Sequence, residues 1–160
     1  MANATLYDIL VAVKADLSAL SLKGMPPANI IIHKAITTKL RDLPAVRFPC
    51  IVIAPWGRET MPPAAGTNVR DDITYPVAIA MMASEATDNE QPGQRQTQNL
   101  NQYLTWRETI ISSFHNQRLT TLCQQGFVQP LDIVDNTSWH QKNLWVSGLI
   151  LNCTSRKTRG

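Results

Sequence analysis

Cys123 and His115 form the nearest cysteine–histidine pair along the chain. A thiol beside an imidazole base is the arrangement that activates a cysteine nucleophile, and an acidic partner would complete the site of a small hydrolase or transferase. Both residues surround the end of a predicted helix, and no nucleophile motif such as GxSxG accompanies them. We therefore rank a Cys–His enzyme below a non-catalytic role.

Spacings that hold metal ions or phosphates are missing from the sequence. The three histidines and three cysteines are scattered, without CxxC, HxH or HExxH spacing. Asp71 and Asp72 are adjacent, and such a pair is typical of a solvated strand end. The seven glycines stand singly, so neither GxGxxG nor a P-loop occurs. We predict no catalytic residues, no metal and no cofactor.

Basic and aromatic residues give a second alternative, a nucleic-acid-binding module. They gather around a long loop and near the last residue of the sequence: Trp56, Arg58, Arg70, Arg156, Lys157 and Arg159. Without the last three, the basic residues only balance the 12 acidic ones. A balanced domain lacks the broad positive field of a dedicated nucleic-acid binder, so this alternative also ranks below assembly.

Composition predicts one globular domain. The chain has 160 residues, of which 44% are hydrophobic and 17% charged. We expect residues 1–154 to form the domain and residues 155–160 a basic, flexible tail. A weakly charged surface suits packing against neighbouring proteins. No run reaches the ~20 apolar residues of a membrane span, no signal peptide is visible, and three separated cysteines favour a reducing compartment.

Two long helices are expected, at 5–20 and 97–119. Thr5 and Asp8 form a capping pattern, and apolar residues recur at three- and four-residue spacing in both segments. Arg107 falls near the centre of the second apolar stripe. A buried cation requires an acidic or carbonyl partner, which either this chain or a neighbouring subunit could supply.

Five segments are predicted to be strands: 29–33, 50–54, 72–83, 127–134, which Pro130 interrupts, and 144–152. The third alternates cleanly, with large apolar residues on one face and small ones such as Ala78 and Ala80 on the other. Pro76 suggests an edge position or a bulge. Residues 35–43 are ambiguous, 56–71 and 84–95 read as long loops, and 136–138 as a turn. We predict an α/β (α+β) fold with a mixed or antiparallel sheet of about four to five strands and two main helices.

The chain resembles the tail terminator (tail completion) proteins of tailed bacteriophages. The likeness lies in the order of elements over much of the chain. It is carried by the strand Asp72-Ile-Thr-Tyr-Pro-Val-Ala-Ile-Ala-Met81 after a Pro/Gly-rich loop, by the helix from Asn101 to Phe114, and by the strand Trp145-Val-Ser-Gly-Leu-Ile-Leu151.

The resemblance implies a structural virion protein without catalysis. Such a subunit forms a hexameric ring that caps the tail tube and joins it to the neck. Its partners would be copies of itself, the tail tube protein and a neck or connector protein, with DNA passing through the lumen without sequence-specific binding and no membrane. It would be made in the bacterial host cytoplasm and reside in the virion. Another neck or tail connector protein is the closest alternative.

Under this interpretation, several residues are candidates for the subunit interface: Trp56, Arg58, Arg70, Ala78, Ala80, Trp106, Arg107 and Trp139. We expect another element or a neighbouring subunit to cover the alanine-rich face. Arg107 is expected to pair across the ring, so that Arg107→Glu disrupts assembly or folding. The candidate contacts to DNA or a partner are Arg156, Lys157 and Arg159.

Overall fold

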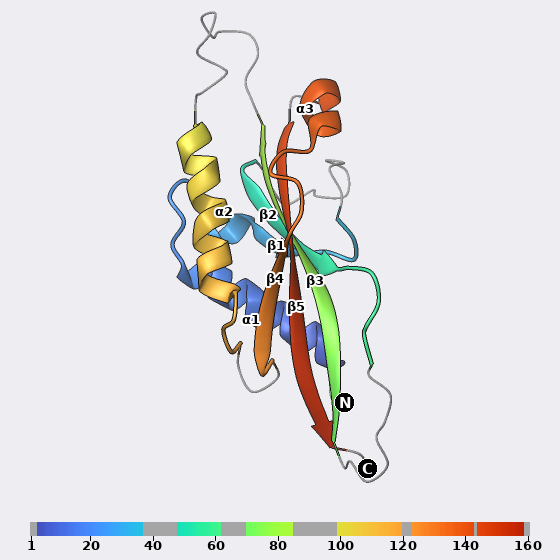
Figure 1. Cartoon of the computed structure of the whole chain (residues 1–160). Helices are drawn as coiled ribbons and strands as arrows, with labels where there is room; N and C mark the ends of the chain where they lie inside the picture. The colour runs from blue at the N-terminus through green and yellow to red at the C-terminus, as the bar shows by residue number, and fades with distance from the viewer. Residues whose placement is uncertain are drawn as a thin grey trace, which may run out of the picture.

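A computed structural model describes residues 3–36, 48–61, 70–84, 99–119, 123–142 and 144–158 (Figure 1). A 3-10 turn at Pro27–Asn29 precedes the first strand. The helices and strands are α1 (Thr5–Ala19), β1 (Ile30–Ile32), β2 (Cys50–Pro55), β3 (Arg70–Ser84), α2 (Leu100–Phe114), β4 (Gln125–Pro130), α3 (Asn136–Lys142) and β5 (Leu144–Thr158). Most of the ambiguous segment 35–43 and of the two expected long loops lies outside the described residues. Within the described part of the chain, no helix is both long and apolar enough to cross a membrane.

The strands form one five-stranded mixed sheet in the order β1-β2-β3-β5-β4. β1 runs parallel to β2, and the other neighbours are antiparallel. The two longest strands, β3 and β5, pair along their whole length, from Arg70 opposite Thr158 to Ser84 opposite Leu144. The predicted α+β fold, with five strands and two main helices, is confirmed.

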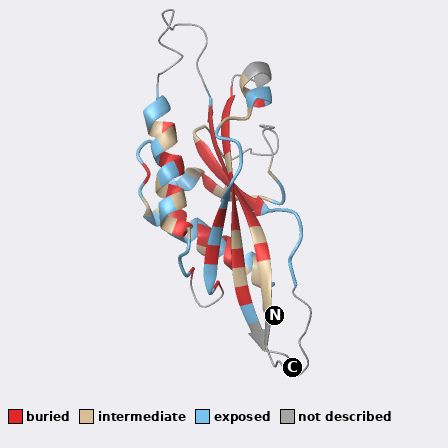
Figure 2. Ribbon diagram, viewed as in Figure 1, coloured by how far each residue is buried: buried red, intermediate tan, exposed pale blue. Residues whose placement is uncertain are grey.

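The main core lies between the sheet and the two long helices, which cover the same face (Figures 1 and 2). From β3 it receives the large alternating side chains Tyr75, Val77, Ile79 and Met81. The helices contribute their apolar stripes, Ile9, Leu10, Val13 and Leu17 from α1 and Tyr103, Trp106, Ile110 and Phe114 from α2. Period-two and helical spacing therefore identified this interface correctly.

The opposite face of the sheet carries smaller side chains and no long helix. A second apolar cluster lies there: Cys50, Val52, Ala80, Met82, Leu144 and Val146. Ile31, Ile36 and Phe48 pack partly buried against it. We call this side the open face, because α1 and α2 both lie on the other side (Figure 1).

The connection after α2 closes the outer edge of β4. The backbone N–H of Asn116 donates to the carbonyl of Gly126 at 2.8 Å, and the Gly126 N–H donates to the carbonyl of Gln117 at 2.8 Å. The Val128 N–H donates to Nδ1 of His115 at 3.1 Å, which places the imidazole proton on Nε2. The chain therefore leaves the helix at Phe114, not at residue 119 as we predicted, because the next residues are needed along this edge.

Of the edge position or bulge predicted for Pro76, the structure shows the second: Pro76 lies in a central strand, beside the point where β2 ends opposite Val77 and the chain bulges outward. Its missing N–H therefore interrupts only that end of the ladder. Two other predictions about the strands and turns are wrong in detail. Residues 155–158, expected in a flexible tail, continue β5 because the long β3 offers them a partner. The expected turn at 136–138 begins α3, since the Asp135 carboxylate accepts hydrogen bonds from the Thr137 N–H at 3.2 Å and the Ser138 hydroxyl at 2.8 Å.

Gly126→Ala is expected to destabilise the protein by roughly 1–3 kcal/mol, because a Cβ there would meet the Phe114 carbonyl at 2.9 Å and the Leu151 side chain at 3.2 Å. Urea denaturation followed by circular dichroism measures this loss. Gln129→Ala, at an exposed position of the same strand, should change stability by no more than about 0.5 kcal/mol. Equal stabilities of the two variants would contradict the tight packing of β4 under α2.

Candidate functional site

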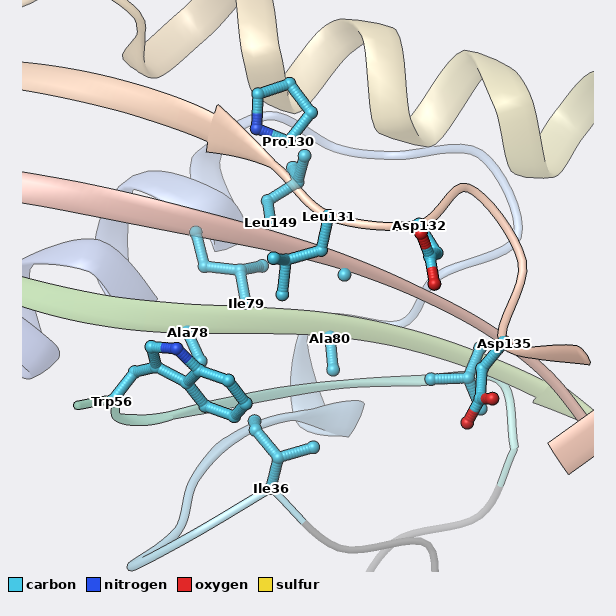
Figure 3. A pocket seen from close by; sticks show the side chains of 12 residues that line it. Ile36, Trp56, Ala78, Ile79, Ala80, Pro130, Leu131, Asp132, Asp135 and Leu149 are labelled. Carbon is cyan, nitrogen blue, oxygen red and sulfur yellow. The ribbon is translucent and has the colours of Figure 1, made fainter. Parts of the chain in front are cut away.

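A hollow of about 480 Å³ lies on the open face of the sheet (Figure 3). Its lining is mainly apolar, with acidic residues at one end: Ile36, Trp56, Ala78, Ile79, Ala80, Pro130, Leu131, Asp132, Asp135, Val146, Gly148 and Leu149. We call it the open-face hollow. It gathers three of the residues that we proposed for a subunit interface, Trp56, Ala78 and Ala80.

Small residues at the centre of the sheet give the hollow its depth. Ala80 of β3 lies directly opposite Gly148 of β5, and Ala78 is the next residue on the same face. A Cβ at Gly148 would lie 3.3 Å from Cδ1 of Leu131. The missing side chain at this position therefore lets Leu131 pack close to the β5 backbone.

One wall is an outward excursion of the chain after β2. The Trp56 N–H donates to the carbonyl of Pro76 at 3.2 Å, and the ladder resumes only at Thr60, which exchanges two backbone hydrogen bonds with Thr74. The residues between have no paired position on β3, so they project from the sheet as in a bulge. Trp56 is 46% exposed, and its indole ring lies over Ala78 (Figure 3).

The other wall is a similar excursion after β4. The Leu131 N–H donates to the carbonyl of Gly148 at 3.1 Å. The next backbone N–H of this segment that donates to β5 is that of Asp135, which donates to the carbonyl of Val146 at 2.8 Å. Between them, the Gly148 N–H donates to the Asp132 carbonyl at 3.3 Å, so Leu131 and Asp132 together face Gly148 as in a bulge. The regular strand that we predicted to run to residue 134 ends at Pro130.

Arg107 holds this second excursion from the helical side of the sheet. Its Nη2 donates to the Leu131 carbonyl at 2.6 Å. Its Nη1 donates to the Ser147 hydroxyl at 2.6 Å and to the Gly148 carbonyl at 2.9 Å, with the Asp132 carbonyl at 3.4 Å. Burial lowers the pKa of the Arg107 guanidinium, and the nearby Asp132 carboxylate opposes that shift. The partners of this cation are thus backbone carbonyls and a hydroxyl of its own chain.

Two proposed interface residues, Arg107 and Trp106, prove to be part of the protein interior, and a third, Trp139, is only partly exposed. Arg107 is only 6% exposed and is satisfied within the chain, so the expected pairing across a ring is wrong. Trp106 is 1% exposed, donates from Nε1 to the Lys23 carbonyl at 2.7 Å and packs against Tyr103. Trp139 is partly buried against the main core. Large aromatic residues on these helices therefore reflect core packing.

The remaining candidates lie apart from the hollow or beyond the described side chains. Arg58 is exposed in the excursion after β2. Arg156 donates from Nε to the Asp72 carboxylate at 2.9 Å, and this pair lowers the pKa of Asp72 and raises that of Arg156. One charge of the proposed DNA contact is thus paired within the chain. The side chains of Arg70 and Lys157, and Arg159 altogether, lie outside the described residues.

The cysteine and histidine that we considered as a dyad have different partners in the structure. Cys123 is fully buried, and its thiol shares a hydrogen bond with Cys153. That bond lowers the pKa of Cys123 and raises that of Cys153, which burial raises further. His115 uses Nδ1 to accept from the β4 backbone. In the part of the chain that the structure describes, no group of three or more His, Cys, Asp or Glu residues is placed to hold a metal ion.

Sequence reasoning missed the second wall of the hollow. It treated residues 127–134 as a strand interrupted by Pro130, whereas β4 ends at that proline and Leu131, Asp132 and Ile133 are exposed beyond it. The proline signalled the interruption, since a proline often marks the end of a regular ladder, but it did not reveal the wall that follows. The apolar exposure of Leu131 and Ile133, at 38% and 52%, is visible only in three dimensions.

Comparison of the chain with protein-family models found no match, and comparison with curated proteins also found none. The geometry of the open-face hollow and the order of the elements are therefore the basis for a functional proposal.

Arg107→Met is expected to lower the free energy of unfolding by about 2–4 kcal/mol, because several buried carbonyls lose a charged donor. Arg107→Lys keeps the charge but loses the planar fork, so a loss of roughly 1–3 kcal/mol is expected. Urea denaturation measures both. Arg58→Met removes an exposed arginine and should change stability by no more than about 0.5 kcal/mol. If Arg107→Met is as stable as Arg58→Met, the guanidinium does not hold the excursion.

In the native protein, all three thiols are expected to react slowly with Ellman's reagent at pH 8. All three are buried, which keeps the reagent away from them. Burial also raises the pKa of Cys50 to about 11, so that its reactive thiolate is scarce, whereas Cys123, whose pKa is lowered, is protected by burial alone. In denaturant all three should react rapidly. A native thiol that reacts as fast as a free cysteine would contradict the buried placement and revive the Cys–His enzyme alternative.

Proposed function

We propose that this protein is a structural subunit that acts by packing its open face against another protein, and that it is a tail terminator subunit of a tailed bacteriophage. The observation that carries the proposal is the open-face hollow, an apolar depression on the side of the sheet without α1 or α2. Its side chains offer surface for packing and little for chemistry. Of its two acidic residues, Asp135 is occupied in capping α3.

Exposed apolar side chains around the hollow support a protein partner. Trp56 and Leu131 form its walls, and Phe127 and Ile133, 53% and 52% exposed, lie nearby in the chain on β4 and after it. Apolar groups gathered on one side of a surface are typical of interfaces between proteins. Tryptophan in particular often supplies much of the binding energy at such surfaces.

The specific assignment depends on the resemblance to tail terminator proteins in the order of elements. It implies a hexameric ring that caps the tail tube, joins it to the neck and lets DNA pass through the lumen. The described structure fits this role in one respect, since the lining of the open-face hollow is mainly apolar. Another neck or tail connector protein would use the same face, and binding to the purified tube and neck proteins distinguishes the two roles.

Light scattering of the purified chain over a range of concentrations is expected to show a species of about six subunits, and negative-stain images should show a ring with a central hole. Trp56→Asp on the wall of the hollow should shift the mass toward the monomer while circular dichroism stays unchanged, because this side chain is half exposed. A chain that stays monomeric at every concentration and binds neither tube nor neck protein would contradict the proposal.

A further inference from the structure

The exposed large apolar side chains of the described residues gather mainly on two opposite sides of the sheet. Trp56 and Leu131 line the hollow on the open face, and Phe127, which lies opposite Asn152 of β5, is on the same face. Ile133 is exposed two residues after Leu131. Tyr7 and Val11, 51% and 44% exposed, lie on α1, which packs on the other face. Met61 and Leu100 are also exposed, but neither belongs to the hollow or to α1.

The exposed side of α1 has an ordered pattern. Tyr7, Val11 and Lys14 are spaced so that they fall on one side of a helix, and all three are exposed. Ile9, Leu10, Val13 and Leu17 face the core instead. We call Tyr7, Val11 and Lys14 the α1 stripe: two apolar side chains followed by a cation.

The open-face hollow has the complementary pattern. Its floor and walls are apolar, and an acidic rim, Asp132 and Asp135, lies at one end (Figure 3). Asp132 is exposed, and its carboxylate is one of the few charged groups along this lining. Arg107 lies near that carboxylate, but its N–H groups are bound to carbonyls and to Ser147. The rim therefore suits a partner that presents a cation beside an apolar side chain.

We propose that the α1 stripe of one copy packs into the open-face hollow of the next copy, with Lys14 facing Asp132. This inference rests on the proposed function, because it identifies the contact between ring subunits. An amphipathic helix whose anchors recur at three- and four-residue spacing is a common occupant of an apolar groove. Each contact removes both exposed apolar surfaces from water, which stabilises the pair.

The positions of the two surfaces determine the type of assembly. Because the α1 stripe and the hollow lie on opposite sides of the sheet, one copy can use both at once. Contacts between unlike surfaces repeat head to tail and form a closed ring when the rotation between copies allows it. Pairing hollow to hollow would instead leave every α1 stripe exposed to water and would bring two acidic rims together. A nucleic acid in the hollow would meet the same acidic rim.

A charge exchange tests the facing pair. Lys14→Glu is expected to abolish self-association at concentrations where the unaltered chain is fully assembled, and adding Asp132→Lys in the same chain should restore it. Asp16→Lys reverses an exposed charge on another side of α1 and should assemble normally. Circular dichroism confirms that each variant is folded. If the double variant is folded but does not recover, the two residues do not face each other, and the proposal is wrong.

Mixing two defective variants tests the head-to-tail contact without depending on Asp132. Val11→Asp damages only the stripe and Leu131→Asp only the hollow, and both positions are partly exposed. Each variant alone should be monomeric, and an equimolar mixture should give a heterodimer that grows no further, because one intact stripe and one intact hollow remain.

The outcomes separate this inference from the function it rests on. Rings formed by either variant alone, or a mixture that stays monomeric, would overturn the inference. If either result is seen while the unaltered chain forms rings, the proposed function stands and another surface makes the contact between subunits. If the unaltered chain is monomeric, the inference fails, and binding to tube and neck proteins decides the proposed function.

Discussion

The open face depends on one buried cation. Arg107 extends from the helical side of the sheet to the place where the chain leaves β4, and it donates to carbonyls of both the departing segment and β5. A charge in the interior is costly unless such donors are satisfied. Its partners are fixed backbone groups, so the guanidinium determines where β4 ends and where Leu131 can lie. This one side chain thereby links the helical core to a wall of the open-face hollow.

The central pair of strands supplies the frame on which both surfaces are built. β3 and β5 remain in register over 15 residues each. On one face their large side chains meet the helices, and on the other Ala78, Ala80 and Gly148 leave space. The short excursions after β2 and β4 occur beside this small-residue region. The open-face hollow is thus deep at its centre because these residues of β3 and β5 are small, and its walls are the two excursions beside them.

Local patterns predicted most of the fold and little of the hollow. Alternation in β3 and helical spacing in α1 identified the core face, since both follow from backbone geometry. The partner of Arg107 could not be predicted, because the carbonyls that bind it come from distant segments. Trp106 was placed at an interface for its residue type, whereas burial in the core decides its role. The walls of the hollow depend on interrupted strand pairing, which no single-sequence pattern specifies.

The sealed edge of β4 has a consequence for how such a protein behaves at high concentration. Its Gly126 and Val128 backbone groups already have partners in the connection that follows α2. An incoming strand at that edge would have to displace these bonds, so β4 is a poor template for the strand-by-strand growth that leads to fibres. Association through side-chain surfaces, such as the contact that we propose, would leave this backbone ladder intact.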